Sequence, residues 1–155
     1  CPLIVCGDEQ ATAALLQNGD FSANPIIWQG SGRAVNDRQN KANKVYAVEL
    51  GRQPKSFGQQ IVLDGEKEKL TLSWRMRANE KFAPLSAEKG PIEVQLRSRE
   101  KKEHTIENFK LEKTGEWIEC SLSYDCKGVK TINLMVNICA GKGTLEFDDF
   151  VATAN

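Results

Sequence analysis

The sequence predicts an all-β protein, an antiparallel β-sandwich of about nine strands. Three observations support this prediction. From residue 14 onward, hydrophobic residues recur at every second position rather than at the 3.6-residue period of a helix. Turn signals, most of them containing glycine, separate the alternating segments. No ten-residue stretch combines an amphipathic pattern with helix caps, so helices are not expected.

The first half of the chain contains four expected strands. The fourth is the clearest, because its apolar residues alternate with threonine, serine and arginine along the whole segment. Such alternation places one face of a strand in the core and the other in solvent. A long connection that carries Trp28 follows the first strand. In order, these strands cover residues 14–21, 44–50, 57–63 and 70–77.

The second half contains five further strands, which begin after a second long connection, 78–90. The charged run 97–104 alternates in sign, which is typical of a solvated hairpin turn. Turn signals at Thr114-Gly115, Lys127-Gly128 and 141–143 delimit the later strands. In order, these strands cover residues 92–99, 104–111, 118–123, 129–139 and 144–151.

Composition excludes several classes of protein. The chain has 155 residues, which is one domain's length, and its 21 basic and 21 acidic residues give no net charge. A nucleic-acid-binding protein that relies on bulk charge needs a basic excess. No apolar run approaches the roughly 20 residues of a membrane helix, and 40% hydrophobic residues argue against disorder. Among the five cysteines, a Cys120–Cys126 disulfide and free buried thiols remain alternatives.

Residues 1–13 differ from the remainder, and residues 14–155 are expected to form the single domain. Residues 11–13, Ala-Thr-Ala, have the small-x-small form of a signal-peptidase site. Alternatively, Cys1 or Cys6 is a lipid-acceptor cysteine, or the segment is an ordinary amino-terminal extension. The two export interpretations predict a protein that is secreted, periplasmic or displayed at the cell surface on a lipid anchor.

Six short segments follow one another in an order that is informative. They are LLQNGDFS (15–22, with Trp28 soon after), YAVEL (46–50), QQIVLDG (59–65), LTLSWRMRA (70–78), TGEW (114–117) and GTLEFDDF (143–150). Together they resemble the jelly-roll carbohydrate-binding modules that accompany cellulases and xylanases, within the galactose-binding-like superfamily. The resemblance covers about residues 14–153 and is more specific for the fold than for the ligand.

The resemblance implies a jelly roll and a particular strand order. Strand 44–50 would pair with 144–151, strand 57–63 with 129–139, and 92–99 would form a hairpin with 104–111. One sheet would then expose polar side chains from three strands on its outer face. By alternation, this outer face would present Gln60, Gln95, Arg97, Asn133, Met135 and Asn137.

Sugar recognition needs two kinds of side chain, and the sequence offers candidates for both. Hydroxyl groups are bound by planar amides and guanidinium groups, and the apolar faces of sugars are bound by aromatic rings. Gln60, Gln95, Arg97, Asn133 and Asn137 are the candidate hydroxyl-binding residues, with an ordinary polar surface as the alternative. Trp28 is the first candidate for the ring, and its alternative role is to close one end of the sandwich. Phe57, Phe82 and Tyr124 are the remaining ring candidates. Alternation places Trp74 in the core, and the resemblance implies that Trp117 is packed at the entrance of its strand.

The resemblance also implies a structural calcium ion between the first and last strands. Gly19, Asp20, Asp148 and Asp149 match the positions of the calcium ligands, and oxygen donors of this kind suit calcium. Ser22 departs from the family pattern, which usually has a glutamate there. Without a metal, the two adjacent aspartates would serve as turn and capping residues.

Catalytic motifs are scarce. Asp148 and Asp149 are neighbours on a strand and are expected to point to opposite faces, so they cannot flank one glycosidic bond. The chain has a single histidine and neither a Gly-x-Ser-x-Gly nor a phosphate-binding Gly-x-x-x-x-Gly-Lys sequence. His104 with Arg97 and Gln95 keeps a polysaccharide lyase as a minor alternative.

The sequence therefore predicts a non-catalytic module that binds a polysaccharide or oligosaccharide, without nucleic acid and without a transmembrane segment. Such a module raises the local concentration of a catalytic domain attached to it, or of the cell. The alternative from another class is a structural or protein-interaction domain on the same fold.

Overall fold

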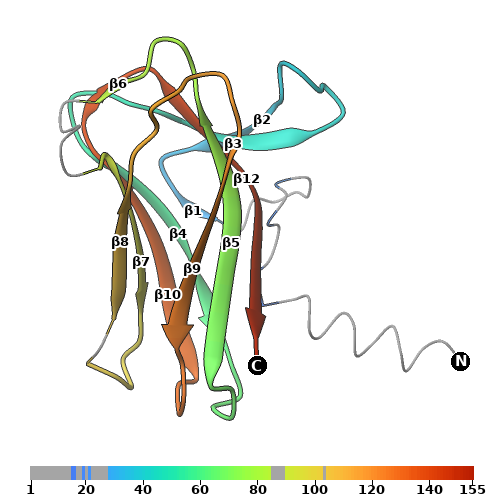
Figure 1. Cartoon of the computed structure of the whole chain (residues 1–155), viewed down its shortest axis with the longest axis vertical. Coiled ribbons are helices and arrows are strands. Elements are labelled where there is room, and N and C mark those ends of the chain that lie inside the picture. The colour runs from blue at the N-terminus through green and yellow to red at the C-terminus, as the bar shows by residue number, and fades with distance from the viewer. Residues whose placement is uncertain (1–14, 17–18, 20, 22–27, 85–89, 103) are drawn as a thin grey trace, which may run out of the picture.

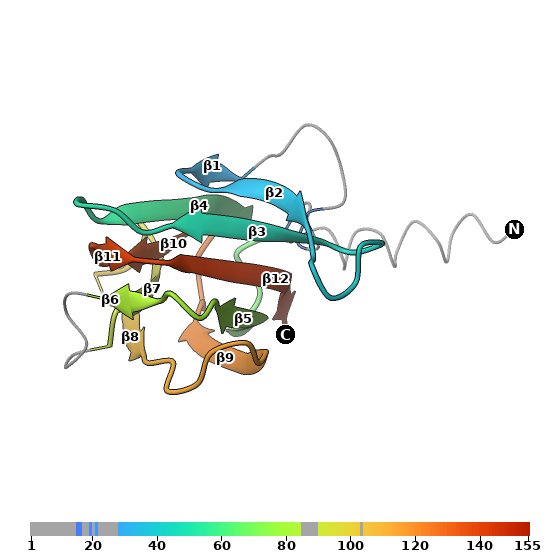
Figure 2. The same ribbon diagram turned by 90° about the horizontal axis from the view of Figure 1, so that it is seen from above.

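The computed structural model describes residues 15, 16, 19, 21, 28–84, 90–102 and 104–155. In this part of the chain all regular structure is β-strand, and every strand pair is antiparallel. Two five-stranded sheets lie face to face as a sandwich (Figures 1 and 2). The all-β sandwich that the sequence predicts is therefore confirmed.

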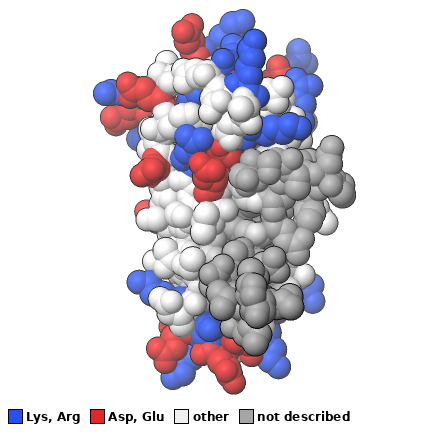
Figure 3. All heavy atoms as spheres, turned by 90° about the vertical axis from the view of Figure 1, so that its right-hand side faces the viewer, with Lys and Arg blue, Asp and Glu red and all other residues white. Residues whose placement is uncertain are grey.

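We call the two layers sheet A and sheet B. Figure 2 shows them as two adjacent stacks of strands, and Figure 3 views the molecule from the side of sheet B. Sheet A contains, in spatial order, β1 (Gln29–Gly30), β4 (Lys55–Val62), β10 (Thr131–Ile138), β7 (Ile92–Arg97) and β8 (Thr105–Phe109). Sheet B contains β2 (Arg33–Asn36), β3 (Lys44–Glu49), β12 (Thr144–Ala154), β5 (Lys69–Ala78) and β9 (Ile118–Asp125). A separate two-stranded ladder joins β11 (Gly141–Lys142) to β6 (Ala83–Pro84).

Eight of the nine expected strands lie where the sequence places them, as β3, β4, β5, β7, β8, β9, β10 and β12. The three expected pairings also occur, namely β3 with β12, β4 with β10 and β7 with β8. The expected strand 14–21 is wrong at its described residues, which form turns and bends. One of them, Phe21, has a left-handed φ of 57° that a strand does not allow. The additional strands β1, β2, β6 and β11 have two to four residues, too few for a period to appear.

The space between the sheets is filled by apolar side chains with a dense aromatic group at its centre. Trp28 belongs to this group and is only 5% exposed. Its ring lies 4.8 Å from that of Phe150 and 5.5 Å from that of Phe21, and it meets Phe57 edge-on at 5.7 Å. Burial of a large aromatic ring stabilises the folded state, whereas exposure of the ring to water does not. The long connection therefore folds inward at Trp28.

The three cysteines in the described residues, Cys120, Cys126 and Cys139, are all free thiols. The structure thus decides against a Cys120–Cys126 disulfide. Burial, together with the nearby charge of Glu107, raises the pKa of Cys120 to about 11, so this thiol stays protonated near neutral pH. Within the part of the chain that the structure describes, no helix has the length and hydrophobicity needed to span a membrane.

Candidate functional site

The outer face of sheet A gathers the polar residues that the sequence singled out. On the central strand β10, Asn133 lies opposite Gln60 of β4 on one side and Arg97 of β7 on the other. Two residues further along β10, Met135 lies opposite Gln95. The next outward residue of β10 is Asn137, so all five candidate hydroxyl-binding residues share one face. We call the surface that these five residues form together with Glu93 the amide face.

The register gives the amide face a regular spacing. Neighbouring strands are about 4.8 Å apart, and outward residues on one strand recur about every 7 Å. Gln60, Asn133 and Arg97 are exposed, whereas Gln95 and Asn137 are half-buried. The face therefore offers amide donors and acceptors at repeated intervals in two directions, which suits a ligand with many hydroxyl groups.

Glu93 organises this face and was not among the sequence candidates. One of its carboxylate oxygens, Oε1, accepts hydrogen bonds from Gln95 Nε2 and from Asn137 Nδ2, the latter at 3.1 Å. Because both amides donate to the same carboxylate, their carbonyl oxygens are left to accept hydrogen bonds from a ligand. The alternation of β7 could have identified Glu93, since it lies two residues before Gln95 on the same face.

The apolar part of the amide face is aliphatic. Met135 at its centre is 40% exposed, and Ile106 of β8 is 39% exposed. No aromatic residue occupies an outward position of β4, β7, β8 or β10 in the described part of the chain. The prediction that Trp28 forms an exposed platform is wrong, because the ring is held in the core. Phe57 and Tyr124 are buried as well, so neither is a platform.

A polysaccharide lyase would combine His104 with a tyrosine, and both tyrosines of the chain are buried. Tyr46 is 1% exposed, and its hydroxyl accepts a hydrogen bond from the backbone N–H of Gly32 at 3.0 Å. Tyr124 is 3% exposed and belongs to sheet B. His104 is exposed in the hairpin between β7 and β8, where its ring nitrogen contacts the Lys102 carbonyl at 3.3 Å.

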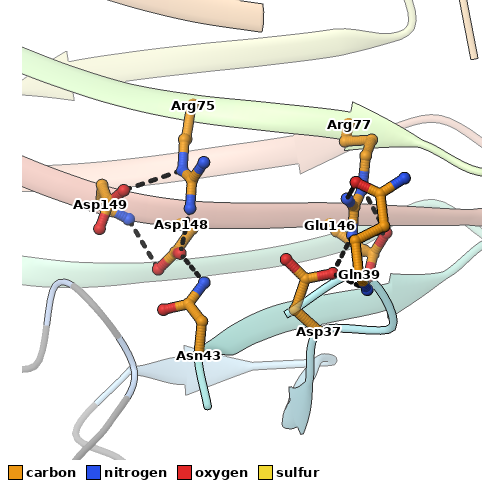
Figure 4. Close-up of polar contacts among 8 residues, drawn as sticks. All are labelled: Asp37, Gln39, Asn43, Arg75, Arg77, Glu146, Asp148 and Asp149. Carbon is orange, nitrogen blue, oxygen red and sulfur yellow. Dashed lines mark hydrogen bonds and ion pairs between the residues drawn. The ribbon is translucent and has the colours of Figure 1, made fainter. Parts of the chain in front are cut away.

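The two adjacent aspartates of β12 lie on the outer face of sheet B and both contact one arginine of β5 (Figure 4). Arg75 Nη2 donates to Asp148 Oδ2 at 3.0 Å, and Arg75 Nε lies 2.8 Å from Asp149 Oδ2 as an ion pair without hydrogen-bond alignment. The expectation that these aspartates point to opposite faces is therefore wrong. The reason is a break in the β12 register between Asp148 and Val151, where Asp149 adopts a left-handed φ of 54°.

The described candidate ligands for calcium make contacts within the chain instead. Asp148 Oδ2 also accepts from Asn43 Nδ2 at 2.7 Å, and its Oδ1 accepts from the Asp149 N–H at 2.9 Å. The Gly19 carbonyl accepts from the Phe150 N–H at 3.0 Å. The positive charge that the carboxylates require is supplied by Arg75, which would repel a metal ion beside it. Asp20, the remaining expected ligand, lies outside the described residues.

Burial has a larger effect on the pKa of Asp148 than its hydrogen bonds have. It raises the pKa of this carboxyl group above the usual value, and the hydrogen bonds from Asn43 and Arg75 offset the rise only in part. Because Asp148 is fully buried, its pair with Arg75 is a contact within the sheet. No group of three or more His, Cys, Asp or Glu side chains within the described residues is placed to hold a metal ion.

A second arginine cluster lies beside the first on sheet B (Figure 4). Arg77, 4% exposed, donates to Asp37 at 2.8 Å, to Glu146 at 3.0 Å and to Gln39 at 3.0 Å. Trp117 covers both clusters, because the guanidinium carbons of Arg75 and Arg77 lie 4.2 and 4.3 Å from the centre of its ring. The expectation that Trp117 is packed is met by these stacked arginines.

Comparison with known proteins supports the fold. No protein-family model and no curated protein matches this chain. Among solved structures, a family 16 carbohydrate-binding module matches 90% of this chain and 99% of its own length, at 13% identity and a TM-score of 0.68. A family 61 module, TmCBM61, solved in complex with β-1,4-galactotriose, matches 91% of this chain and 98% of its own, at 20% identity and a TM-score of 0.58.

The enzymatically active domain of tailspike protein 4 from bacteriophage CBA120 has the same fold within a larger chain. It matches 91% of this chain at 11% identity and a TM-score of 0.67, but this chain spans only 21% of its length. These likenesses show that the fold is the jelly-roll sandwich of carbohydrate-binding modules, which confirms the fold that the resemblance implied.

Proposed function

We propose that this protein binds carbohydrate through the amide face of sheet A and catalyses no reaction there. The observation that carries the proposal is the β4–β10–β7 register, which sets Gln60, Asn133 and Arg97 side by side and continues to Gln95 and Asn137. The fold is shared with modules that bind sugars, and one of these was solved with a galactotriose bound.

The chemistry of binding follows from the side chains. Amide carbonyl oxygens accept hydrogen bonds from sugar hydroxyls, while amide N–H groups and the guanidinium of Arg97 donate to sugar oxygens. Glu93 holds Gln95 and Asn137 in fixed orientations, which lowers the entropy lost on binding. Met135 and Ile106 contribute apolar contact to the C–H faces of the ring, and without an aromatic ring we expect weak binding.

Affinity electrophoresis on β-glucans, xylans and β-1,4-galactans tests the proposal. The parent protein should be retarded by at least one of them, and Asn133→Ala and Gln60→Ala should each weaken retardation about tenfold, as expected for the loss of a polar contact. Gln53→Ala is the matched control, because Gln53 is an exposed glutamine outside sheet A. Retention of the parent by none of the polysaccharides would overturn the proposal and favour the structural or protein-interaction alternative.

We further propose that the protein acts outside the cytoplasm, secreted, periplasmic or at the cell surface, where its polysaccharide ligand is accessible. Attachment to a catalytic domain would raise that domain's concentration on the polymer. The support is chemical, since Ala11-Thr12-Ala13 suits a signal peptidase and Cys1 or Cys6 suits lipid attachment. Fractionation of cells that express the full-length gene product should recover this domain in the medium, in the periplasmic extract or on the cell surface. Recovery of the domain only in the cytoplasmic fraction would overturn the proposal.

A further inference from the structure

The outer face of sheet B contains a pocket with a volume of about 520 Å³. It lies at the end of the sheet where β12 begins, which is the upper end in Figure 1. Side chains of both charges gather at the upper end of the face in Figure 3. Its volume is within the range of roughly 300–1,000 Å³ that is typical of small-molecule sites.

One row of residues across sheet B explains why the surface is hollow here. The register places Ala47 of β3 between Arg33 of β2 and Glu146 of β12, and Glu146 opposite Arg77 of β5. Ala47 is the smallest of these side chains and leaves space between its long neighbours. Gly115, whose φ of +79° favours glycine, lines the same pocket without a side chain to fill it.

The floor of the pocket is rigid and the walls carry free charged groups. Arg77 and Glu146 on the floor are fixed to each other and to buried Asp37. Around them stand three cations, Arg33, Arg38 and Lys81, and two acids, Glu49 and Glu80. None of these five wall residues takes part in an ion pair with another described residue.

The charges identify the class of ligand. Lining cations and acids nearly balance, so the pocket lacks the net charge that would hold a free anion or a metal ion. It offers charged donors and charged acceptors together, and a sugar hydroxyl is both donor and acceptor. Hydrogen bonds to charged partners are about twice as strong as neutral ones, so a compact site can hold a small polyol.

We propose that this pocket is a second carbohydrate site, separate from the amide face, and that it takes a neutral sugar unit such as a monosaccharide or the end of a chain. This second site goes beyond the function proposed for sheet A and is formed by different residues. The two sites lie on opposite outer faces, so one molecule could engage two saccharides at once and gain avidity on a polymer.

A titration followed by ¹H–¹⁵N NMR tests both sites in one experiment. The probes are the methyl β-glycosides of D-glucose, D-xylose, D-galactose and D-mannose, with sodium D-glucuronate as the anionic comparison. At least one neutral glycoside should shift the amide signals of Ala47, Gly115 and Thr144 in a saturable manner. Signals of Gln95 and Asn133 report on the amide face independently.

Two variants and a control assign the shifts to the pocket. Ala47→Leu fills the hollow without changing charge, and Arg33→Ala removes an exposed wall cation. Each should raise the Kd at the pocket about tenfold or more and leave the amide-face signals unchanged. Arg99→Ala, which removes an exposed arginine in the β7–β8 hairpin, should change neither.

The outcomes separate this inference from the proposed function. Saturable shifts confined to the amide face would overturn the second site and leave the function of sheet A intact. Shifts confined to the pocket, sensitive to both variants, would support the second site alone. Pocket shifts caused only by glucuronate, or pocket Kd values unchanged in both variants, would overturn the inference as stated.

Discussion

On sheet A the outward arginine, Arg97, is exposed among amides, whereas on sheet B the outward arginine Arg77 is buried between carboxylates. Both residues lie on strands that are paired on both sides, and both point away from the core. The difference arises because Asp37, in the segment after β2, covers the end of sheet B and supplies a buried partner. The same residue type is therefore structural on one face and available to a ligand on the other.

The test with the largest expected effect replaces each arginine with alanine. Arg77→Ala leaves Asp37 buried without its partner, and breaking a buried ion pair typically costs about 3–5 kcal/mol. Arg97→Ala should lower the free energy of unfolding by less than about 0.5 kcal/mol, because the side chain is exposed. Equilibrium unfolding in urea measures both. Equal losses in the two variants would contradict the division between the faces.

The acid side of the stability profile gives a second, smaller test. Burial alone would raise the pKa of Asp37, but the hydrogen bonds from Arg77 and the Gln39 N–H, with the charge of Arg77, outweigh it and lower the pKa. A lowered carboxyl pKa adds stability that is present above the unfolded value of 3.8 and is lost as pH falls through the folded pKa. Asp37→Asn should therefore be less stable at neutral pH and lose less of its stability below about pH 4.

Asp148 should show the opposite sign. Its raised pKa means that its contribution is most favourable at low pH and declines as pH rises through the folded pKa. Replacing it with asparagine should steepen the loss of stability in acid relative to Asp37→Asn. Thermal unfolding midpoints between pH 2 and 7 would measure both slopes, and parallel profiles for the two variants would contradict the assignment.

The amide face could be predicted because alternation along each strand was combined with the strand order that the family resemblance implied. A period of two fixes which residues of β4, β7 and β10 point outward. The pairing of these strands was implied by the resemblance to carbohydrate-binding modules, and in the structure it sets Gln60, Asn133 and Arg97 in one row. Glu93 follows from the same rule, although its role appears only when its contacts with Gln95 and Asn137 are seen.

Features that depend on distant segments could not be predicted in this way. Trp28 does not belong to an alternating hydrophobic pattern. Its ring packs against Phe21, Phe57 and Phe150, which come from three separate parts of the chain. The Asp148–Asp149 pair departs from alternation because the chain bulges there. The extra residue of a bulge leaves no mark in the composition of the strand, so the sequence does not reveal it. The pocket on sheet B likewise could not be predicted, because the pairing register of the strands decides which small residues lie between larger ones.

A ring placed on the amide face would sharpen the contrast between faces. Met135→Trp puts an aromatic surface at the exposed centre of that face, and an aromatic contact contributes about 0.5–1.5 kcal/mol, or roughly two- to tenfold tighter binding of a retained polysaccharide. Val151→Trp is the matched control, since Val151 is an exposed apolar residue of β12 in sheet B. Affinity electrophoresis measures both, and equal gains in both variants would show that nonspecific hydrophobic contact causes the effect.

Calcium should have the smallest effect, because sheet B already contains the positive charge that its adjacent aspartates need. With Arg75 in contact with both carboxylates, adding calcium chloride or EDTA should move the thermal midpoint by less than about 1 °C. A specific site filled at 100 times its Kd would instead add about 2.7 kcal/mol, a shift of several degrees. Magnesium chloride at equal ionic strength controls for salt. A rise specific to calcium would restore the metal site that the family resemblance implied, and its loss in Asp20→Ala would identify Asp20 as a ligand.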